Sequence, residues 1–430
     1  MEIANVSNME FTLADMFGDT LTWGVYQAYR EELETLVPNF LRHDEPIKVL
    51  SLTSEEVESY EEQLNNTTAH LYRCLEHFMT NATDEDYERM GITNPRLKRL
   101  IKMSWDADQT APHIHKGLFN GLYGNFDFTV DSDGKTWAYE YNGNTPVLTY
   151  ESIVLQDMVY GRLAEDVDIG QFNSLSESWQ ALFEDAYRRH GSLVIVFGGF
   201  SELVNDLLTV ETMAFSAQEA GHDVTIIEIK DDIEFDSYSK QFYLKDTDKP
   251  IDYMFGLFPW EDYDDEALKA FIWNYENLCN TGKGTVIAEP AYKLVASNKA
   301  FLAYMTALDV DAMCENGLIP TYLDPSEVTT SKYVGKPVYG RMSSNIRTFD
   351  QDTMTEDTGG EYEDSLFIYQ PFFDMIEHGS DFYQLRMWVA PQQGPSGFEF
   401  APCGLAVRKS TSANSMNVET EEFVPHIITA

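Results

Sequence analysis

Between residues 192 and 290, short apolar runs alternate with longer amphipathic segments, and no other feature constrains the fold as strongly. The runs are SLVIVFGGF, DVTIIEI, DYMFGLF and GTVIAEP, and the segments at 207–221 and 265–278 have helical spacing. Strands that alternate with helices usually form a mainly parallel sheet. We therefore predict an α/β lobe over residues 191–290.

The segments on either side have different patterns. Residues 53–80 have the spacing of an amphipathic helix that begins with a capping box at Thr53 and Glu56, and NPRLKRLIKMSW continues as helix. After the lobe, a helix at SNKAFLAYMTAL precedes the strands KYVGKPVYG, LFIYQPFF, FYQLRMWVA and APCGLAVRKS. The predicted class is α/β and α+β, with a mostly helical region at 1–110, a hairpin and helix at 111–190, and a mostly antiparallel lobe at 291–430.

Composition excludes several classes of protein. The formal net charge of the 430 residues is -43, which argues against binding to nucleic acid or to an anionic membrane. Charge alone is explained more readily by solubility or high salt than by a cationic substrate. No apolar run could span a bilayer, and the N-terminus lacks secretory features, so we expect a cytoplasmic protein.

Cysteine and histidine give little indication of a metal site. The four cysteines lie far apart and form no CxxC pair, which indicates neither a disulfide framework nor a zinc site. His113 and His115 lie two residues apart, and we expect them in a solvated loop.

Residues 122–144 alternate, turn at DSDG and alternate back, which predicts an antiparallel hairpin. Residues two apart share a face of a strand, so Asp127 lies opposite the aromatic face, together with Ala138, Glu140 and Asn142. A two-residue loop in DSDG sets Asp127 opposite Ala138 and diagonal to Glu140. Oxygen ligands at this spacing suit Mg²⁺. The competing interpretation, a hairpin with acids facing water, is favoured by pattern alone.

Basic residues are scarce, 29 in all, so their placement in the last third is informative. Lys299 begins a helical segment, and Lys336 lies at a strand end before the loop GRMSSN. Gly340 and Arg341 begin this loop, whose N–H groups and hydroxyls could cradle phosphate. Surface lysines are an equally good interpretation of Lys299 and Lys336.

From about residue 85 to the end, the chain resembles the synthetase domain of glutathionylspermidine synthases, in a stand-alone form without the amidase domain. The fragments that carry the resemblance occur in the family's order: LYGNFDF…YEYNGNTP, LFPWE, AEPAYKLVASNKAFLAYM, YVGKPVYGR, IYQPFF and EEFVPHII. The resemblance implies an ATP-grasp-like fold whose C-terminal lobe binds nucleotide. It also implies amide formation that depends on ATP and Mg²⁺ and passes through an acyl phosphate.

The resemblance assigns contacts residue by residue. Those that match magnesium ligands are Asp127, Glu140 and Asn142. Those that match ATP contacts are Lys299 and Lys336 at the phosphates and Tyr369 and Gln370 beside the adenine.

On the acid-substrate side, Thr145 matches a small hydroxyl residue and Arg408 an arginine near the transferred phosphate. Asn125 stands where the family usually has an arginine that serves the substrate carboxylate, and Lys409 stands where acids are usual. These departures put the acid substrate, and activity itself, in question, because asparagine offers no fixed positive charge.

Acidic residues in the α/β lobe match regions where family members have acids, some of which serve the amine. These residues are Asp206, Glu211 and Glu261, and helix spacing favours a surface position for Glu211. We expect small-molecule or peptide carboxylate and amine substrates, with a polyamine as one candidate amine. The alternatives are an inactive nucleotide-binding protein that keeps the fold, and an interaction protein that binds no nucleotide.

Overall fold

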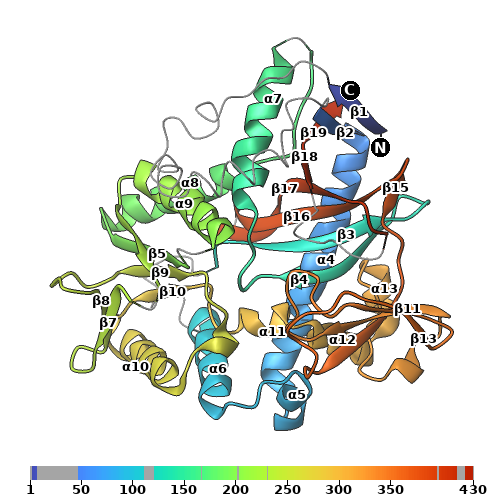
Figure 1. Cartoon of the computed structure of the whole chain (residues 1–430). Helices are drawn as coiled ribbons and strands as arrows, with labels where there is room; N and C mark the ends of the chain where they lie inside the picture. Colours follow the sequence, from blue (N-terminus) through green and yellow to red (C-terminus); the bar gives the residue numbers. More distant parts are fainter. Residues whose placement is uncertain are drawn as a thin grey trace.

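The computed structural model describes residues 2–6, 47–110, 121–165, 167–200, 203–229, 231–394, 397–413 and 422–429. One parallel sheet lies beside several antiparallel sheets, which confirms the predicted α/β and α+β class (Figure 1). His113, His115 and a large part of the region predicted to be helical at 1–110 lie outside the described residues. Within the described ranges, no helix combines the length and the apolar character needed to cross a membrane.

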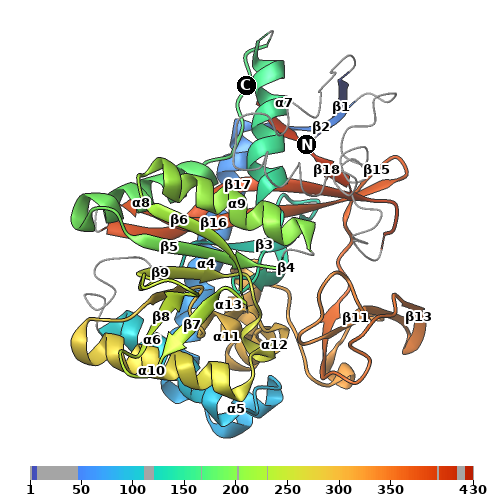
Figure 2. The same cartoon turned by 60° about the vertical axis from the view of Figure 1, so that its left-hand side comes forward.

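The α/β lobe has the predicted parallel sheet. Its strands are β5 (Val194–Gly199), β6 (Asp223–Glu228), β9 (Tyr253–Gly256) and β10 (Val286–Ala288), in the order β10-β9-β5-β6. Its helices are α9 (Val204–Glu219) and α10 (Asp265–Thr281). A small hairpin, β7 (Ile233–Asp236) and β8 (Gln241–Leu244), extends the lobe. Helix α8 (Leu175–His190) packs on both α9 and the neighbouring antiparallel sheet, so it joins the lobe to the rest of the molecule (Figure 2).

The predicted hairpin forms the edge of a six-stranded antiparallel sheet. Its strands are β3 (Gly124–Val130) and β4 (Thr136–Asn142). The order β18-β17-β16-β3-β4 adds β16 (Asp381–Gly394), β17 (Gly397–Ser410) and β18 (Glu422–Val424), and β15 (Ile376–His378) pairs with β16. The hairpin is therefore completed by strands that follow it by more than 230 residues, and the division into four domains stays a prediction.

The predicted register of the hairpin is wrong, because a bulge falls between Asp127 and Phe128. Asp127 lies directly opposite Glu140, and Phe128 lies opposite Ala138. A bulge sets two residues of one strand against one of the other and so moves the side chains beyond it to the other face. Ala138 consequently belongs to the hydrophobic core with Phe128, and does not lie beside the acids.

The remaining antiparallel sheet lies in the last third, in the order β13-β12-β11-β14. Its strands are β11 (Lys332–Pro337), β12 (Arg347–Asp350), β13 (Thr353–Asp357) and β14 (Phe367–Pro371). The helices α11 (Lys293–Ser297), α12 (Lys299–Leu308) and α13 (Val310–Glu315) precede it. The loop between β11 and β12 contains the GRMSSN sequence.

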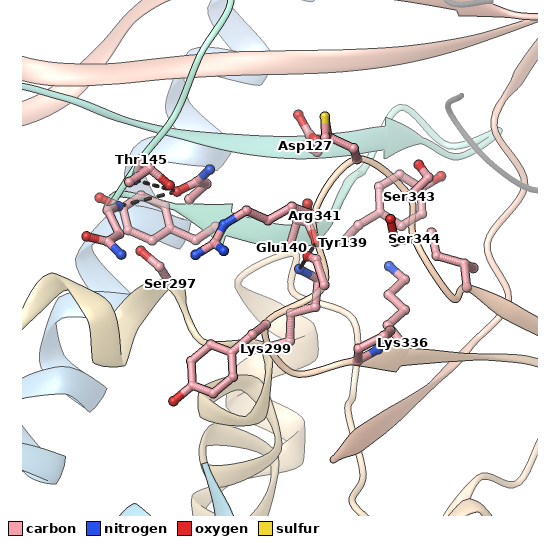
Figure 3. Close-up of a pocket in the computed structure, with 18 of the residues that line it drawn as sticks. Asp127, Tyr139, Glu140, Thr145, Ser297, Lys299, Lys336, Arg341, Ser343 and Ser344 are labelled. Carbon is pink, nitrogen blue, oxygen red and sulfur yellow. Dashed lines mark hydrogen bonds and ion pairs between the residues drawn. The ribbon is translucent and has the colours of Figure 1, made fainter. Parts of the chain in front are cut away.

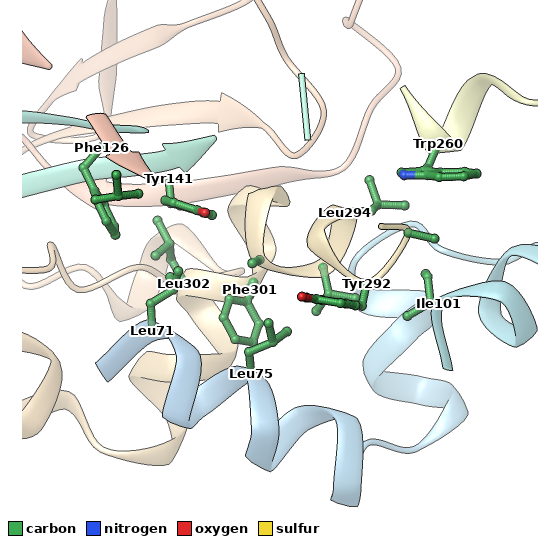
Figure 4. Close-up of a cluster of buried hydrophobic side chains, with 14 of the residues drawn as sticks. Leu71, Leu75, Ile101, Phe126, Tyr141, Trp260, Tyr292, Leu294, Phe301 and Leu302 are labelled. Atoms are coloured by element: carbon green, nitrogen blue, oxygen red, sulfur yellow. The ribbon is translucent and has the colours of Figure 1, made fainter. Parts of the chain in front are cut away.

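Helices support the hairpin from below. The predicted helix α4 (Ser54–Asn81) has the capping box of Thr53 and Glu56, and α5 (Asp84–Arg89) and α6 (Pro95–Thr110) follow it. Leu71 and Leu75 of α4 belong to the same buried cluster as Phe126 and Tyr141 of the hairpin and Phe301 of α12 (Figure 4). This cluster fixes the hairpin on its aromatic face and leaves the acidic face available.

The ends of the chain meet in a sheet that the sequence did not predict. Strands β1 (Glu2–Val6) and β2 (Ile47–Thr53) are antiparallel, and β19 (His426–Thr429) pairs with β2 in parallel. A turn of π-helix (Glu151–Leu155) and α7 (Gln156–Ala164) form the helix predicted after the hairpin, and Gln156 holds the buried His426 backbone.

Candidate active site

A cavity of about 460 Å³ opens between the hairpin, the α/β lobe, helices α11–α12 and the β11–β14 sheet (Figure 3). Small-molecule sites commonly have volumes of roughly 300–1,000 Å³ and lie where several units of a fold meet. The cavity is thus large enough for a small-molecule substrate and lies between several parts of the chain that carry the resemblance.

Four strands of the six-stranded sheet present polar side chains to this cavity from one face. Residues that pair directly across strands share a face. Asp127 pairs with Glu140 on one side and Arg386 on the other, and Gln384 of β16 pairs with Arg408 of β17. All five line the cavity. We call this set the ionic face: Asp127, Glu140, Gln384, Arg386 and Arg408.

Asp127 is the centre of the ionic face and is only 4% exposed. Arg386 binds it with two parallel bonds, Nε to Oδ1 at 2.6 Å and Nη2 to Oδ2 at 2.9 Å, and Arg408 Nη1 lies 3.4 Å from Oδ2. Burial opposes ionisation of Asp127, but the two guanidinium groups prevail and lower its pKa. Asp127 is therefore held as a carboxylate.

Glu140 is neutralised by lysines from the last third. Lys299 Nζ lies 3.1 Å from Glu140 Oε2 and donates to the carbonyl of Gly340 at 2.8 Å. Burial works against the charge of Glu140, but Lys299 and then Lys336 lower its pKa. Lys336 lies 5.3 Å from the ring centre of Tyr139, and burial lowers its pKa to about 8. Neither lysine is the exposed surface lysine that the alternative interpretation requires.

The segment after β4 forms a turn organised by Asn142. Its Oδ1 accepts from the backbone N–H of Asn144 at 3.3 Å and of Thr145 at 3.2 Å. Ser297 Oγ accepts from Gly143 N at 2.8 Å, which fixes the turn to α11. Asn142, Thr145 and Ser297 all line the cavity.

The loop after β11 closes another side of the cavity. Gly340, Arg341, Ser343 and Ser344 line it, and Met342 and Ser343 have φ values of 50° and 56°. Positive φ is uncommon for residues other than glycine and often marks functional loops. Arg341 forms an ion pair with Glu261, so the loop reaches the α/β lobe.

The α/β lobe contributes acids of a different kind to the cavity. Asp206 of α9 and Glu261 of the 3₁₀ turn η2 (Trp260–Asp262) both line it. Burial raises the pKa of Asp206 to about 7, and burial raises the pKa of Glu261 although Arg341 opposes this. Among the described residues, Glu261 Oε2 has no hydrogen-bond partner. A cation that bound beside these acids would lower their pKa again and stabilise their charged form.

Glu211 does not lie on a helix surface, so that expectation is wrong. It is 5% exposed, and burial raises its pKa to about 8. The reason is that α9 is covered on most sides, with Leu207, Val210 and Ala214 all buried. Glu211 does not line the cavity.

Besides Glu211, two residues that match site residues of the family do not line the cavity. Asn125 is 2% exposed and Tyr369 packs against Tyr333, while Gln370 reaches the cavity and donates to the carbonyl of Tyr139 at 3.1 Å. The other selected residues line it, although their roles stay predictions. Arg386, which lies in the predicted strand FYQLRMWVA, also lines the cavity, and the sequence analysis assigned it no role. Its alternation with Gln384 along β16 was the available signal.

The ionic face has the chemistry of a magnesium–phosphate site. Mg²⁺ is commonly bound by one or two carboxylates together with substrate phosphate oxygens. Asp127 and Glu140 are directly opposed carboxylates, and Asn142 adds an amide oxygen two residues along. Within the described part of the chain, no group of three His, Cys, Asp or Glu side chains could hold a metal. Asp127, Glu140 and Asn142 could hold Mg²⁺ together with phosphate oxygens.

Comparison with known proteins identifies the family of this chain. The model of the family described as glutathionylspermidine synthase preATP-grasp matches residues 43–429. The chain belongs to this family, which confirms the resemblance.

Individual relatives differ in how much of the chain they cover. A Haemophilus influenzae protein with a provisional assignment as an acid–amine ligase is 26% identical over 379 residues, 85% of this chain and 86% of its own length. The glutathionylspermidine synthase of Crithidia fasciculata is 37% identical over 79 residues, 18% of this chain and 11% of that protein. A crystal structure from Methylobacillus flagellatus, provisionally a gamma-glutamylcysteine synthetase, covers 77% of this chain and 88% of its own, with 11% identity and a TM-score of 0.42. That TM-score is too low to support an argument.

Proposed function

We propose that this chain is an ATP- and Mg²⁺-dependent ligase that joins a carboxylate to an amine. The observation that carries the proposal is that one cavity holds four cationic side chains around two carboxylates and, on the α/β lobe, acids whose pKa is raised. The first arrangement suits a nucleotide with its metal, and the second suits a cationic amine. Family membership and the Haemophilus relative support the same assignment.

The proposed reaction has two balanced steps. A carboxylate oxygen of the acid attacks the γ-phosphorus of ATP, the bond to the bridging oxygen of ADP breaks, and an acyl phosphate forms. The neutral amine then attacks the acyl carbon, phosphate leaves with the bonding electron pair, and the nitrogen loses a proton. The products are amide, ADP, phosphate and a proton. Phosphoryl transfer between anions depends mainly on positioning and on charge stabilisation.

Side chains of the last third would receive the nucleotide. Lys299, Lys336 and the backbone of the Gly340–Ser344 loop would bind phosphate oxygens, and Gln370 would lie beside the adenine. Asp127, Glu140 and Asn142 would hold magnesium, which neutralises phosphate charge when bound. The lysines would keep the γ-phosphate oriented and draw charge from it during transfer.

The acid and the amine would approach from different sides. Thr145 and Arg408 would face the acid and the transferred phosphate. The amine, with a polyamine as the candidate, would be attracted by Asp206 and Glu261, because a nearby cation favours the charged form of a buried carboxyl group. A cytoplasmic location belongs to the same proposal, because the reaction requires ATP.

The second candidate is a nucleotide-binding protein that has lost catalysis. The observation in its favour is that Asn125 is uncharged and buried and does not line the cavity.

One experiment distinguishes the two candidates. ADP release is measured with Mg²⁺ and ATP over a matrix of peptide carboxylates and polyamines, and ATP binding is measured by calorimetry in parallel. Release that requires both an acid and an amine supports the ligase. Binding of ATP without release for any pair supports the second candidate and contradicts the first.

A further inference from the structure

We propose that Arg386 is the side chain that binds the reacting anionic group, the acid carboxylate and its phosphoryl acceptor oxygen, in place of the missing arginine at position 125. Asp127 accepts two hydrogen bonds from this guanidinium and would release it when the site is loaded. The inference rests on the proposed function, but the binding experiments below can be read without turnover.

Asn125 cannot take this role itself. Its side chain is 2% exposed and does not line the cavity. Within the described chain, its Nδ2 group has no hydrogen-bond acceptor. An amide carries no fixed positive charge with which to bind an anionic group.

Arg386 lies one register step away on the same face. In the pairing of β3 with β16, Trp388 lies opposite Asn125 and Arg386 lies opposite Asp127. An arginine at 386 therefore projects from almost the same part of the sheet as an arginine at 125, but from the neighbouring strand. Its other neighbour across β17 is the small Ala406, which leaves room for the long side chain.

The surroundings of Arg386 connect the two substrates. One edge of the guanidinium binds Asp127, and Nη1 lies 3.3 Å from the carbonyl oxygen of Val147, two residues after Thr145. Arg386 thus spans the distance between the proposed metal–phosphate site and the turn proposed to face the acid. A planar guanidinium binds carboxylate and phosphate with two parallel bonds, which a lysine cannot do.

Magnesium at Asp127 would compete with Arg386 for the charge of the same carboxylate and would repel the guanidinium. Arg386 occupies both oxygens of Asp127, and Arg408 approaches one of them. Loading of the site would therefore weaken the hold of Asp127 on Arg386 and allow the guanidinium to turn to an anion. The group that it can then meet without crossing the cavity is the anion that enters beside Asp127 and Val147.

The first test measures Mn²⁺ binding to the nucleotide-free protein by electron paramagnetic resonance. Arg386→Gln should bind Mn²⁺ at least tenfold more tightly than the wild type, because a competing cation is removed. Lys409→Gln is the charge-matched control: Lys409 lies beside Arg408 but pairs with Glu422 and Asp381, so its change should leave Mn²⁺ affinity unaltered. Equal or weaker Mn²⁺ binding by Arg386→Gln, with a lowered melting temperature, would mean that Arg386 only clamps the sheet and would overturn the proposal.

The second test measures binding of inorganic phosphate in the presence of Mg²⁺ and ADP. Arg386→Gln should weaken phosphate binding at least tenfold. Arg386→Lys, which keeps the charge and serves if the glutamine variant does not fold, should also weaken it, because the paired bonds are lost. The double variant Asn125→Arg/Arg386→Ala should recover phosphate affinity to within about threefold of the wild type. Unchanged affinity in Arg386→Lys, or no recovery in the double variant, contradicts the proposal.

The two binding tests decide the Arg386 inference independently of whether the protein is a ligase. If the wild type binds Mn²⁺ and phosphate but releases no ADP with any acid–amine pair, the proposed function fails. The Arg386 inference is then still decided by the two binding tests.

Discussion

The acids of the ionic face and those of the α/β lobe meet in one cavity but have opposite electrostatics. Asp127 and Glu140 each have a cation within ion-pair distance, and their pKa values are lowered. Glu261 also pairs with Arg341, but burial outweighs the neighbouring charges at both Glu261 and Asp206, and their pKa values are raised. Since the residue types are similar, the difference comes from the balance between burial and the neighbouring cations.

This difference indicates how one pocket can serve two substrates of opposite charge. Lys299 and Lys336 add two cations to the two of the ionic face, opposite its two carboxylates, which suits the anion with its metal in the proposed function. Asp206 and Glu261 of the α/β lobe suit the proposed cationic amine. Variants that remove the charge or the titration of single groups test this difference between the two regions.

Lys336→Ala should have the largest effect, a loss of at least about 100-fold in ADP release, because a preorganised charge at the transferred phosphate is removed. Lys332→Ala is the matched control on the same strand, since Lys332 is exposed and packs on Phe372. Melting temperatures of both variants should stay near that of the wild type. Equal turnover in the two variants would contradict the proposed role of Lys336 at the transferred phosphate.

Glu211→Gln should change the pH dependence of stability. The folded protein holds Glu211 protonated up to about pH 8, whereas the unfolded chain ionises near its ordinary value of 4.5. Wild-type stability should therefore fall as pH rises between these values, by about 2 kcal/mol from pH 6.5 to 8.0, and the variant should lack this fall. Urea denaturation at both pH values measures it, with the exposed Glu219→Gln of the same helix as control. Parallel curves for Glu211→Gln and wild type would show that Glu211 is ionised in the fold.

Glu261→Gln should raise KM for the amine about tenfold, because it removes a carboxylate from the amine side. The Kd of ATP should stay within twofold, because the proposed phosphate contacts of the Gly340–Ser344 loop are backbone groups and Arg341 is unchanged. The comparison variant is Glu266→Gln, whose side chain is 79% exposed on α10. Steady-state kinetics with spermidine as the amine probe, beside calorimetry with ATP, gives both numbers. A change in ATP affinity without one in KM would reverse the assignment of the two sides.

The smallest effect concerns Asp206, whose pKa is about 7. Below that pH the carboxyl is neutral, so spermidine affinity should rise a few-fold from pH 6 to pH 8 as the carboxylate forms. The nearby charges of Arg341 and Glu228 shift its pKa in opposite directions. Asp206→Asn should flatten the profile in calorimetric titrations. An unchanged slope in this variant would remove Asp206 from the amine side.

Local patterns predicted much of this architecture. The α/β alternation, the capping box of Thr53 and the hairpin depend on residues close in sequence, so a single sequence displays them. The bulge at Asp127 was not predicted, because it depends on pairing with β4 and β16 together. The pairing of β2 with β19 joins residues more than 370 apart, and no local signal specifies it.

The site was predicted unevenly for the same reason. Glu140 and Lys299 could be selected from pattern and resemblance, although their contact could not. Arg386 was overlooked because only the fold places it opposite Asp127. The position of Glu211 was predicted wrongly, because helical spacing cannot show that α9 is buried on most of its sides.

Calorimetric titration of the wild-type protein with ATP, in the presence and absence of Mg²⁺, tests most directly whether the ionic face receives a metal–nucleotide. We predict binding at least tenfold tighter with Mg²⁺, and loss of this gain in Asp127→Asn. Binding that is absent, or equally strong without the metal, would contradict the assignment.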